Sequence, residues 1–328
     1  MKELQGYVRG VNFGGWLSQC DHTVATYDNF IKEDDFAKAK EMGFDHIRVP
    51  IDYNLFEKGK GEFIEENFGY IEFAIANCRK NGLNMVLDLH RTPGYSFDPY
   101  HNEVGLFADK EYQERFYLIW EELTRRFGHN DDMLVFELLN EVTKKEYQPI
   151  WNDMIRHTIG MIRKTAPNIK IIVGGYYNNS IEALEALDEP YDENVIYSFH
   201  FYEPLLFTHQ GAYWIATMDQ SFRCRFDMTY GEYERLSAKL LCQAYSGFTD
   251  YDPNAIMGEE YFEDLLKVAV KVADERNVCM YCGEFGVIDR ADRKEADKWF
   301  EIFYRVMDKY KIGSAIWNYR KMDFGITE

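Results

Sequence analysis

Two carboxyl side chains follow apolar segments of this chain. Residues 134–139 run directly into Asn140 and Glu141, and residues 278–282 lead to Glu284, which lies between two glycines. A strand that only had to end could do so with Gly, Pro or Ser, whereas an amide and a carboxyl at its end indicate a reaction site. Two carboxyl groups at two strand ends suggest acid–base or glycosidic chemistry.

Other polar or aromatic side chains stand at the ends of further strand-like segments. They are Arg48, His90, His200 with Tyr202, and Trp317. In parallel barrels the reactive groups gather at the carboxyl ends of the strands. Chance seldom places such residues at six strand ends, so we expect them to form one site.

Strand-like and helix-like segments alternate along most of the chain. The predicted strands are 7–13, 44–50, 83–89, 133–139, 169–173, 195–201, 278–283 and 313–317. The predicted helices are 31–42, 64–79, 111–127, 151–164, 181–187, 261–275 and 294–309. Eight such units favour a closed (β/α)8 TIM barrel, a single catalytic domain over residues 1–328. Few residues follow the last strand, so the eighth helix is expected to be missing or shortened.

The alternation is interrupted after the sixth strand. Residues 203–258 are rich in aromatic side chains, Trp214 among them, and form a segment too long for an ordinary connection. We predict that this segment is an inserted subdomain over the cleft.

Composition limits the ligands. The net charge of −19 would repel nucleic acid and anionic lipid, although a negative surface also simply serves solubility. No window approaches the roughly 18 unbroken apolar residues of a membrane span. We expect a monomer without nucleic acid or membrane partners. With no apolar leader at its start, the protein is expected to be cytoplasmic or a processed secreted form.

Cofactor and metal patterns are absent from the sequence. The six cysteines are scattered and predict reduced thiols, and Cys279 and Cys282 form a CxxC on a strand, where residues three apart point to opposite faces. The histidines show no HxH or HExxH spacing, and residues 250–254 lack the glycine and glutamate of a calcium loop. We therefore expect no metal and no cofactor.

Six short motifs in order resemble glycoside hydrolase family five, the cellulase-type retaining barrels. They are residues 47–50 (IRVP), 88–90 (DLH), 139–141 (LNE), 200–202 (HFY), 282–286 (CGEFG) and 316–318 (IWN). Within the family, residues 10–16 (GVNFGGW), the run at 199–202 and the aromatic insertion are similar to the compact endoglucanase C type of clostridia.

The resemblance implies roles for the strand-end residues. Glu141 would be the acid/base and Glu284 the nucleophile, about 5 to 5.5 Å apart as retention requires. Arg48 and Tyr202 would stabilise the charge of Glu284, and His200 would lie near Glu141 and modulate its proton.

The same resemblance implies a sugar-binding surface. Asn140 would bind the 2-hydroxyl, His90 another hydroxyl, and Trp317 would pack on the apolar face of the ring. The family also places a cis peptide after this tryptophan. Trp214 could line outer subsites, although a packing role is nearly as well supported.

Structural roles are the alternative for these residues. Arg48 could pair with Glu137 inside the barrel, and single histidines and aromatic residues at these places are often core residues. The predicted function is a retaining endo-β-1,4-glucanase acting on soluble or mixed-linkage β-glucan poly- or oligosaccharides. The alternatives are a β-mannanase or glucomannanase with the same machinery, and a catalytically silent carbohydrate-binding barrel.

Overall fold

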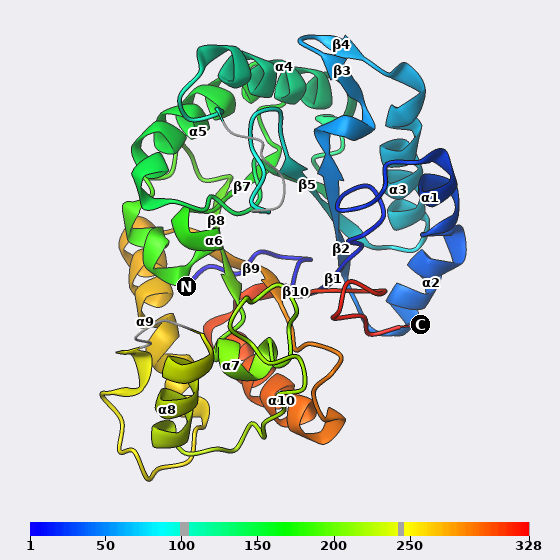
Figure 1. Ribbon diagram of the computed structural model, residues 1–328. Coiled ribbons are helices and arrows are strands. Elements are labelled where there is room, and N and C mark those ends of the chain that lie inside the picture. Colours follow the sequence, from blue (N-terminus) through cyan, green and yellow to red (C-terminus); the bar gives the residue numbers. More distant parts are fainter. Residues whose placement is uncertain (99–104, 242–245, 328) are drawn as a thin grey trace.

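Eight parallel strands close into a barrel. The computed structural model describes residues 1–98, 105–241 and 246–327, and its strands follow the order β1-β10-β9-β8-β7-β6-β5-β2 around the barrel (Figure 1). Their bounds are β1 Arg9–Asn12, β2 His46–Asp52, β5 Asn84–Arg91, β6 Leu134–Glu137, β7 Lys170–Val173, β8 Val195–Phe201, β9 Cys279–Phe285 and β10 Gly313–Ile316. The predicted (β/α)8 barrel is confirmed.

Helices surround the barrel on the outside (Figure 1). They include α1 Val24–Asn29, α2 Glu33–Glu41, α3 Phe68–Lys80, α4 Lys110–Phe127, α5 Gln148–Ile162, α9 Glu259–Arg276 and α10 Arg293–Tyr310, whereas α6 Tyr176–Asn179 is a single turn that follows β7. Each long helix buries one apolar face. In α10, for example, Trp299 and Phe303 are fully buried, and Phe303 stacks on Phe285 of β9 with ring centroids 4.0 Å apart. This packing holds β9, and therefore Glu284, against the helical layer.

The inside of the barrel changes from apolar to polar along the strands. One apolar layer contains Val86, Val135, Ile172, Ile196, Tyr281 and Ala315, with Leu4 and Tyr7 packed against it. Alternate residues of a strand share a face, so Asp88 and His90 follow Val86, and Glu137 follows Val135. The strand period therefore carries buried polar groups toward the carboxyl ends.

Local elements follow the predicted segments with some differences. The short helix predicted over residues 181–187 is a 3-10 helix, η4 Ile181–Ala186. The helix predicted over residues 31–42 is α2, whereas α1 and a short hairpin of β3 Glu57–Gly59 and β4 Glu62–Phe63 were not predicted. Residues 317–327 contain no helix.

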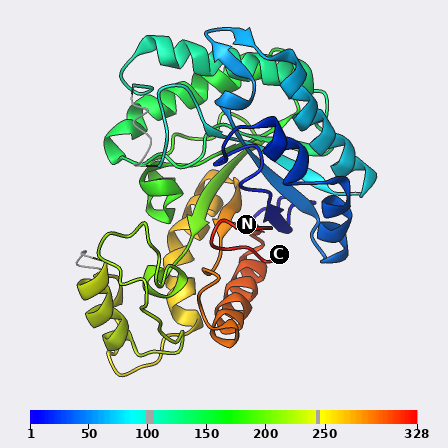
Figure 2. The same cartoon turned by 45° about the vertical axis from the view of Figure 1, so that its right-hand side comes forward.

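The segment between β8 and α9 contains α7 Leu205–Thr208, α8 Tyr230–Leu240 and η5 Ser246–Phe248. In Figures 1 and 2 α8 lies beside α9 at the lower left of the molecule, and Tyr230 of α8 contacts Tyr261 of α9 with ring centroids 6.3 Å apart. Phe226 connects the layers, because its ring contacts both Phe207 of α7 and Phe262 of α9. That this segment is a subdomain over the cleft stays a prediction.

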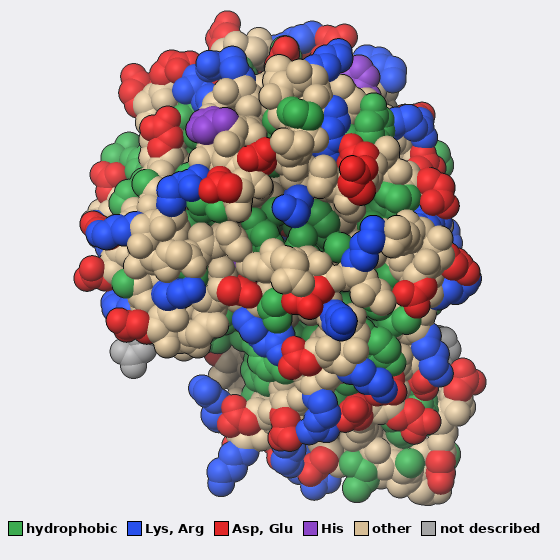
Figure 3. Space-filling view, turned by 180° about the vertical axis from the view of Figure 1, so that it is seen from behind, with side chains coloured by type: hydrophobic (Ala, Val, Ile, Leu, Met, Phe, Trp, Pro, Cys, Tyr) green, Lys and Arg blue, Asp and Glu red, His purple; other side chains and the backbone are tan. Residues whose placement is uncertain are grey.

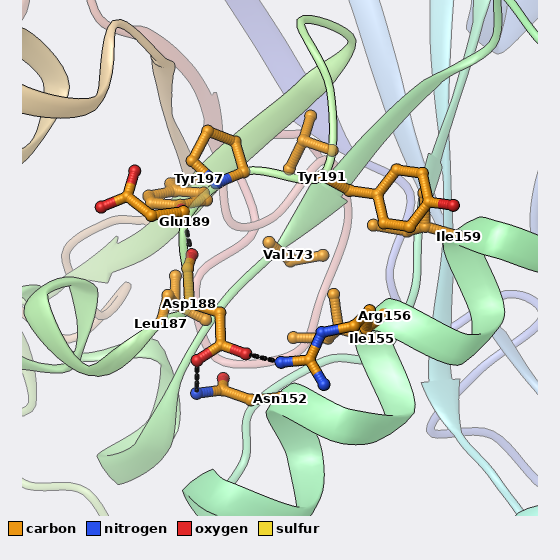
Figure 4. Close-up of a pocket in the computed structure, with 12 residues that line it drawn as sticks. Asn152, Ile155, Arg156, Ile159, Val173, Leu187, Asp188, Glu189, Tyr191 and Tyr197 are labelled. Atoms are coloured by element: carbon orange, nitrogen blue, oxygen red, sulfur yellow. Dashed lines mark hydrogen bonds and ion pairs between the residues drawn. The ribbon is translucent and has the colours of Figure 1, made fainter.

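A small pocket lies between α5 and the residues that follow η4. Figure 4 shows Asn152 and Arg156 of α5 both bound to Asp188, beside Tyr191 and Tyr197. The pocket holds about 100 Å³ and contains none of the predicted site residues. Ligand pockets usually enclose about 300 to 1,000 Å³, so we assign it to packing.

The surface is strongly charged but mixed in sign. On the face seen in Figure 3, acidic and basic side chains are interspersed. Within the described residues, none of the helices combines the length and the apolar character that crossing a membrane requires.

Candidate active site

A fully buried arginine organises the polar end of the barrel. Arg48 of β2 binds Glu137 through Nε (2.7 Å) and Nη2 (3.1 Å), and Glu284 through Nη1 (2.8 Å). Its Nη2 also reaches the Oδ1 of Asn140 at 2.9 Å and Asp88 at 3.0 Å. The predicted pairing of Arg48 with Glu137 and its predicted contact with Glu284 are therefore both present.

One guanidinium thus faces three carboxyl groups. Burial lowers the pKa of Arg48, but Asp88, Glu137 and Glu284 outweigh it and raise that pKa well above its ordinary value. Burial raises the pKa of Asp88 to about 7 and also raises the pKa of Glu137, while Arg48 opposes both shifts. The carboxyl groups are held by the arginine and stay buried because they are paired with it.

The two predicted catalytic glutamates meet across the mouth of the barrel. Oxygen atoms of Glu141 and Glu284 and a ring nitrogen of His200 all lie within 4.8 Å of one another. His200 Nδ1 is 2.8 Å from Glu141 Oε1 and 3.7 Å from Glu284 Oε2. Tyr202 donates to Glu284 Oε2 at 3.0 Å. Residues at or just beyond the carboxyl ends of β6, β8 and β9 therefore come together as predicted.

Burial shifts the pKa values of Glu141 and His200 away from those of exposed residues. Burial raises the pKa of Glu141, and a hydrogen bond from Asn178 opposes the shift. The pKa of His200 is lowered to about 4, chiefly by burial. His200 is consequently neutral near pH 7, whereas Glu141 is the carboxyl that retains a proton more readily than an exposed glutamate would.

The register of two strands aligns His200 with Glu284. A shift in the β8–β9 ladder after Phe199 pairs these two residues directly. Gly283 allows the close approach, because a Cβ there would lie 3.1 Å from His200 Nε2. A side chain at position 283 would push the histidine away from both carboxylates.

The predicted sugar-binding residues form a second side of the site. His90 Nδ1 is 2.6 Å from Asp88, so the imidazole directs Nε2 toward Asn140 Nδ2, 3.5 Å away. The His90 ring is parallel to Trp317 within 5°, with centroids 5.8 Å apart. The predicted cis peptide between Trp317 and Asn318 is confirmed.

The tryptophan of the last strand is fixed by its surroundings. Asn318 receives the backbone N–H of Gly14 at 2.9 Å and donates to its carbonyl at 2.9 Å. A Cβ at Gly14 would lie 2.5 Å from the Trp317 ring. Trp214 packs in the same cluster through Phe324, with centroids 6.4 Å apart, so its predicted place near the site is compatible with the structure.

The three groups at the centre also have the spacing of metal ligands. Among the described residues, Glu141, His200 and Glu284 form the set of donors close enough together to hold an ion. No sequence spacing could have shown this, since the three residues are far apart along the chain and meet only in the fold. The expectation of a metal-free enzyme stays a prediction.

Sequence reasoning missed four residues that contact the site. Asn12 accepts from Arg48 at 2.9 Å, and Asp88 fixes His90; both lie inside motifs whose role was read from other residues. Asn178 donates to Glu141 Oε2 at 2.8 Å, and Asn179 lies 3.4 Å from His200. These two asparagines stand in a turn, where asparagine is ordinary and gives no functional signal.

The sequence is similar to a known protein family and to named relatives. The family model described as Cellulase (glycosyl hydrolase family 5) matches residues 9–323. Cellodextrinase A from Ruminococcus flavefaciens is 41% identical over 312 residues, which cover 95% of this chain and 85% of that protein. Endoglucanase C from Acetivibrio thermocellus is 36% identical over 327 residues, covering 98% and 94%.

Solved structures are similar over the same length. The Clostridial cellulose synthase subunit Z from Clostridioides difficile superposes with a TM-score of 0.79 at 26% identity, covering 98% of this chain and 94% of that one. The predicted likeness to the endoglucanase C type is also confirmed. The chain therefore belongs to the cellulase family, glycosyl hydrolase family 5, and is a glycoside hydrolase of the endoglucanase type.

Proposed function

We propose that the protein is a retaining endo-β-1,4-glucanase with Glu284 as nucleophile and Glu141 as acid/base. The observation that carries this proposal is the approach of their carboxylate oxygens to within 4.8 Å. Retaining enzymes hold their two carboxyl groups about 5 to 5.5 Å apart, whereas inverting enzymes need about 6.5 to 9.5 Å to admit a water. The short separation supports direct attack on the sugar.

In the first step Glu284 attacks the anomeric carbon and the bond to the leaving oxygen breaks. Glu141 gives its proton to that oxygen, and the raised pKa of this buried carboxyl favours the protonated form that the step needs. Arg48 and Tyr202 hold the two oxygens of Glu284, at 2.8 and 3.0 Å, so the carboxylate is oriented before it reacts.

In the second step water attacks the same carbon and the bond to Glu284 breaks. Glu141, now ionised, takes the proton from the water. His200 bridges toward both carboxyl groups and, being neutral near pH 7, adds no charge that would pair permanently with either. The configuration at the anomeric carbon is retained after two displacements.

The substrate assignment rests on the sugar-binding side and on the named relatives. Trp317, His90 and Asn140 offer a flat ring surface beside polar groups, which suits a pyranose. The similarity to an endoglucanase and to a cellodextrinase favours β-1,4-glucan chains, including soluble oligosaccharides. A mannanase with the same machinery is the second candidate, since glucose and mannose differ only at the C2 hydroxyl that Asn140 would bind.

The test is product analysis over a panel of carboxymethylcellulose, mixed-linkage glucan, cello-oligosaccharides, glucomannan and mannan. We expect the glucans to release products in the β configuration, and proton NMR recorded before mutarotation detects this configuration. First-formed α anomers would contradict retention. Faster release of products from mannan than from any glucan would show that mannan, and not β-glucan, is the preferred substrate. Binding without release of reducing sugar would leave only the carbohydrate-binding barrel.

A further inference from the structure

The turn after β7 holds three consecutive residues in left-handed backbone conformations. The angle φ is 50° at Tyr177, 57° at Asn178 and 56° at Asn179. None of them is glycine, and residues with a Cβ visit this region rarely, asparagine most readily. Strain of this kind persists only where the surrounding structure imposes it, and it gathers at functional sites.

Both asparagines of this turn contact the side chains that would move the proton. Asn178 Nδ2 donates to Glu141 Oε2 at 2.8 Å, while His200 Nδ1 lies 2.8 Å from Glu141 Oε1. Asn179 Nδ2 lies 3.4 Å from His200 Nε2 on the other side of the imidazole. Each oxygen of Glu141 therefore has a separate partner, and the histidine is held from both ends.

The turn is tied to the segment that carries the acid/base. The backbone N–H of Asn178 donates to the carbonyl of Val142 at 2.9 Å, one residue beyond Glu141. Gly174 leaves the space that the turn occupies, because a Cβ there would lie 2.3 Å from Asn179 Oδ1. The amide of Asn178 is thereby fixed relative to the carboxyl group, and the left-handed backbone is what directs it there.

We propose that Asn178 is a positioning residue for Glu141 that stabilises the negative charge developing on this carboxyl group as it gives up its proton in the first step. The inference rests on the proposed function, since it assigns a role within that double displacement. An N–H donor binds a carboxylate more strongly than a neutral carboxylic acid. Glu141 becomes ionised as the leaving oxygen takes its proton, so the contribution of Asn178 falls mainly on the first step of substrates whose leaving group needs that proton.

The experiment compares Asn178→Gly with Asn277→Gly. Glycine accepts a φ of 57°, so the first variant loses the amide without adding backbone strain. Asn277 ends α9 with a φ of 52° and serves as a matched control, the same substitution in the same conformation on an element that supplies no site residue. Thermal unfolding of both variants confirms that each is folded.

The readout compares a cello-oligosaccharide with an activated aryl β-cellobioside whose leaving group departs without a proton. For both substrates kcat/KM reports the first step. We expect Asn178→Gly to lower kcat/KM about tenfold on the cello-oligosaccharide and less than about threefold on the activated substrate. Burial raises the pKa of Glu141 and the hydrogen bond from Asn178 lowers it, so loss of that bond should move the basic limb of kcat/KM on the cello-oligosaccharide to higher pH.

Two results would overturn the inference while leaving the proposed function intact. One is an Asn178→Gly enzyme with the kcat/KM values and pH profile of Asn277→Gly. The other is an equal fall of kcat/KM on the two substrates without a shift of the basic limb, which would indicate a structural role only. Failure of the unaltered enzyme to hydrolyse any glucan in the panel would instead refute the proposed function, and the inference with it.

Discussion

Replacing Glu141 by Gln should divide substrates according to their leaving groups. The side chain keeps its length, so its carbonyl oxygen can still accept from His200 at the position of Oε1, 2.8 Å away. The group that replaces Oε2 is an amide nitrogen without a transferable proton, and Asn178 must turn its own amide to accept from it. The fold and the nucleophile are preserved while the acid is lost.

The expected loss follows from the role of the acid. General acid catalysis contributes about 10²- to 10⁴-fold, or about 2.7 to 5.5 kcal/mol in the barrier. We expect kcat/KM for cello-oligosaccharides to fall by that factor in Glu141→Gln. Dinitrophenyl β-cellobioside, whose leaving group departs without a proton, should keep kcat/KM within about tenfold of the unaltered enzyme, because its first step needs no acid.

The assay is a series of aryl β-cellobiosides of graded leaving-group pKa. For Glu141→Gln, log kcat/KM should fall steeply as that pKa rises, and the slope should be shallow for the unaltered enzyme. Added azide should restore kcat on the activated substrate, because azide attacks the glycosyl-enzyme without needing a base and yields a β-glycosyl azide. An equal loss over the whole series, with no response to azide, would refute the acid/base role.

Two further predictions concern stability. Arg48→Met should lower the free energy of unfolding by about 3 to 5 kcal/mol in urea titrations, because it leaves three buried carboxyl groups without their cation. The exposed-pair control Arg9→Met should cost less than about 1 kcal/mol, and equal losses would contradict the assignment. The pKa of His22 is raised to about 9, chiefly by its hydrogen bond to Asp52. Because the pKa is higher in the folded than in the unfolded protein, His22 contributes fully to the free energy of unfolding below about pH 6.5. That contribution is lost as the pH rises through 9. The stability difference between the unaltered protein and His22→Gln should therefore shrink between pH 6 and pH 9.5, and a constant difference would contradict this.

The barrel could be predicted because its signal is repeated along the whole chain. Eight apolar segments separated by helical patterns leave few alternatives to a closed parallel sheet. The exact form of individual helices and strands was harder to predict from the sequence. Residues 181–187 have the apolar spacing of a helix, but so few residues span this connection that it forms the tighter 3-10 helix.

The main side chains of the site were found because they break a rule of core strands. Glu141, Glu284 and His200 are polar groups at the ends of apolar segments, and a packed core would reject them without a partner. The contacts between them depend on strand register, which the sequence does not state. The shift after Phe199 that pairs His200 with Glu284 is an example.

The residues that support the site, Asp88, Asn178 and Asn179, were harder to find because their importance also depends on contacts made only in the fold. Asp88 is one of many acidic residues, and its importance depends on lying two residues before His90 on the same face of β5. Asn178 and Asn179 look like ordinary turn residues. Their left-handed conformations and their contacts become visible only when the turn is seen beside Glu141 and His200.

The most direct test of the account is to trap the glycosyl-enzyme. A 2-fluoro cellobioside with a good leaving group slows both steps, but hydrolysis of the intermediate more, so the covalent adduct accumulates. We predict that mass spectrometry of the digested protein finds one sugar attached to the peptide that contains Glu284, at that residue. A sugar on Glu141, or no adduct under conditions in which the fluoro sugar inactivates the enzyme, would contradict the double displacement.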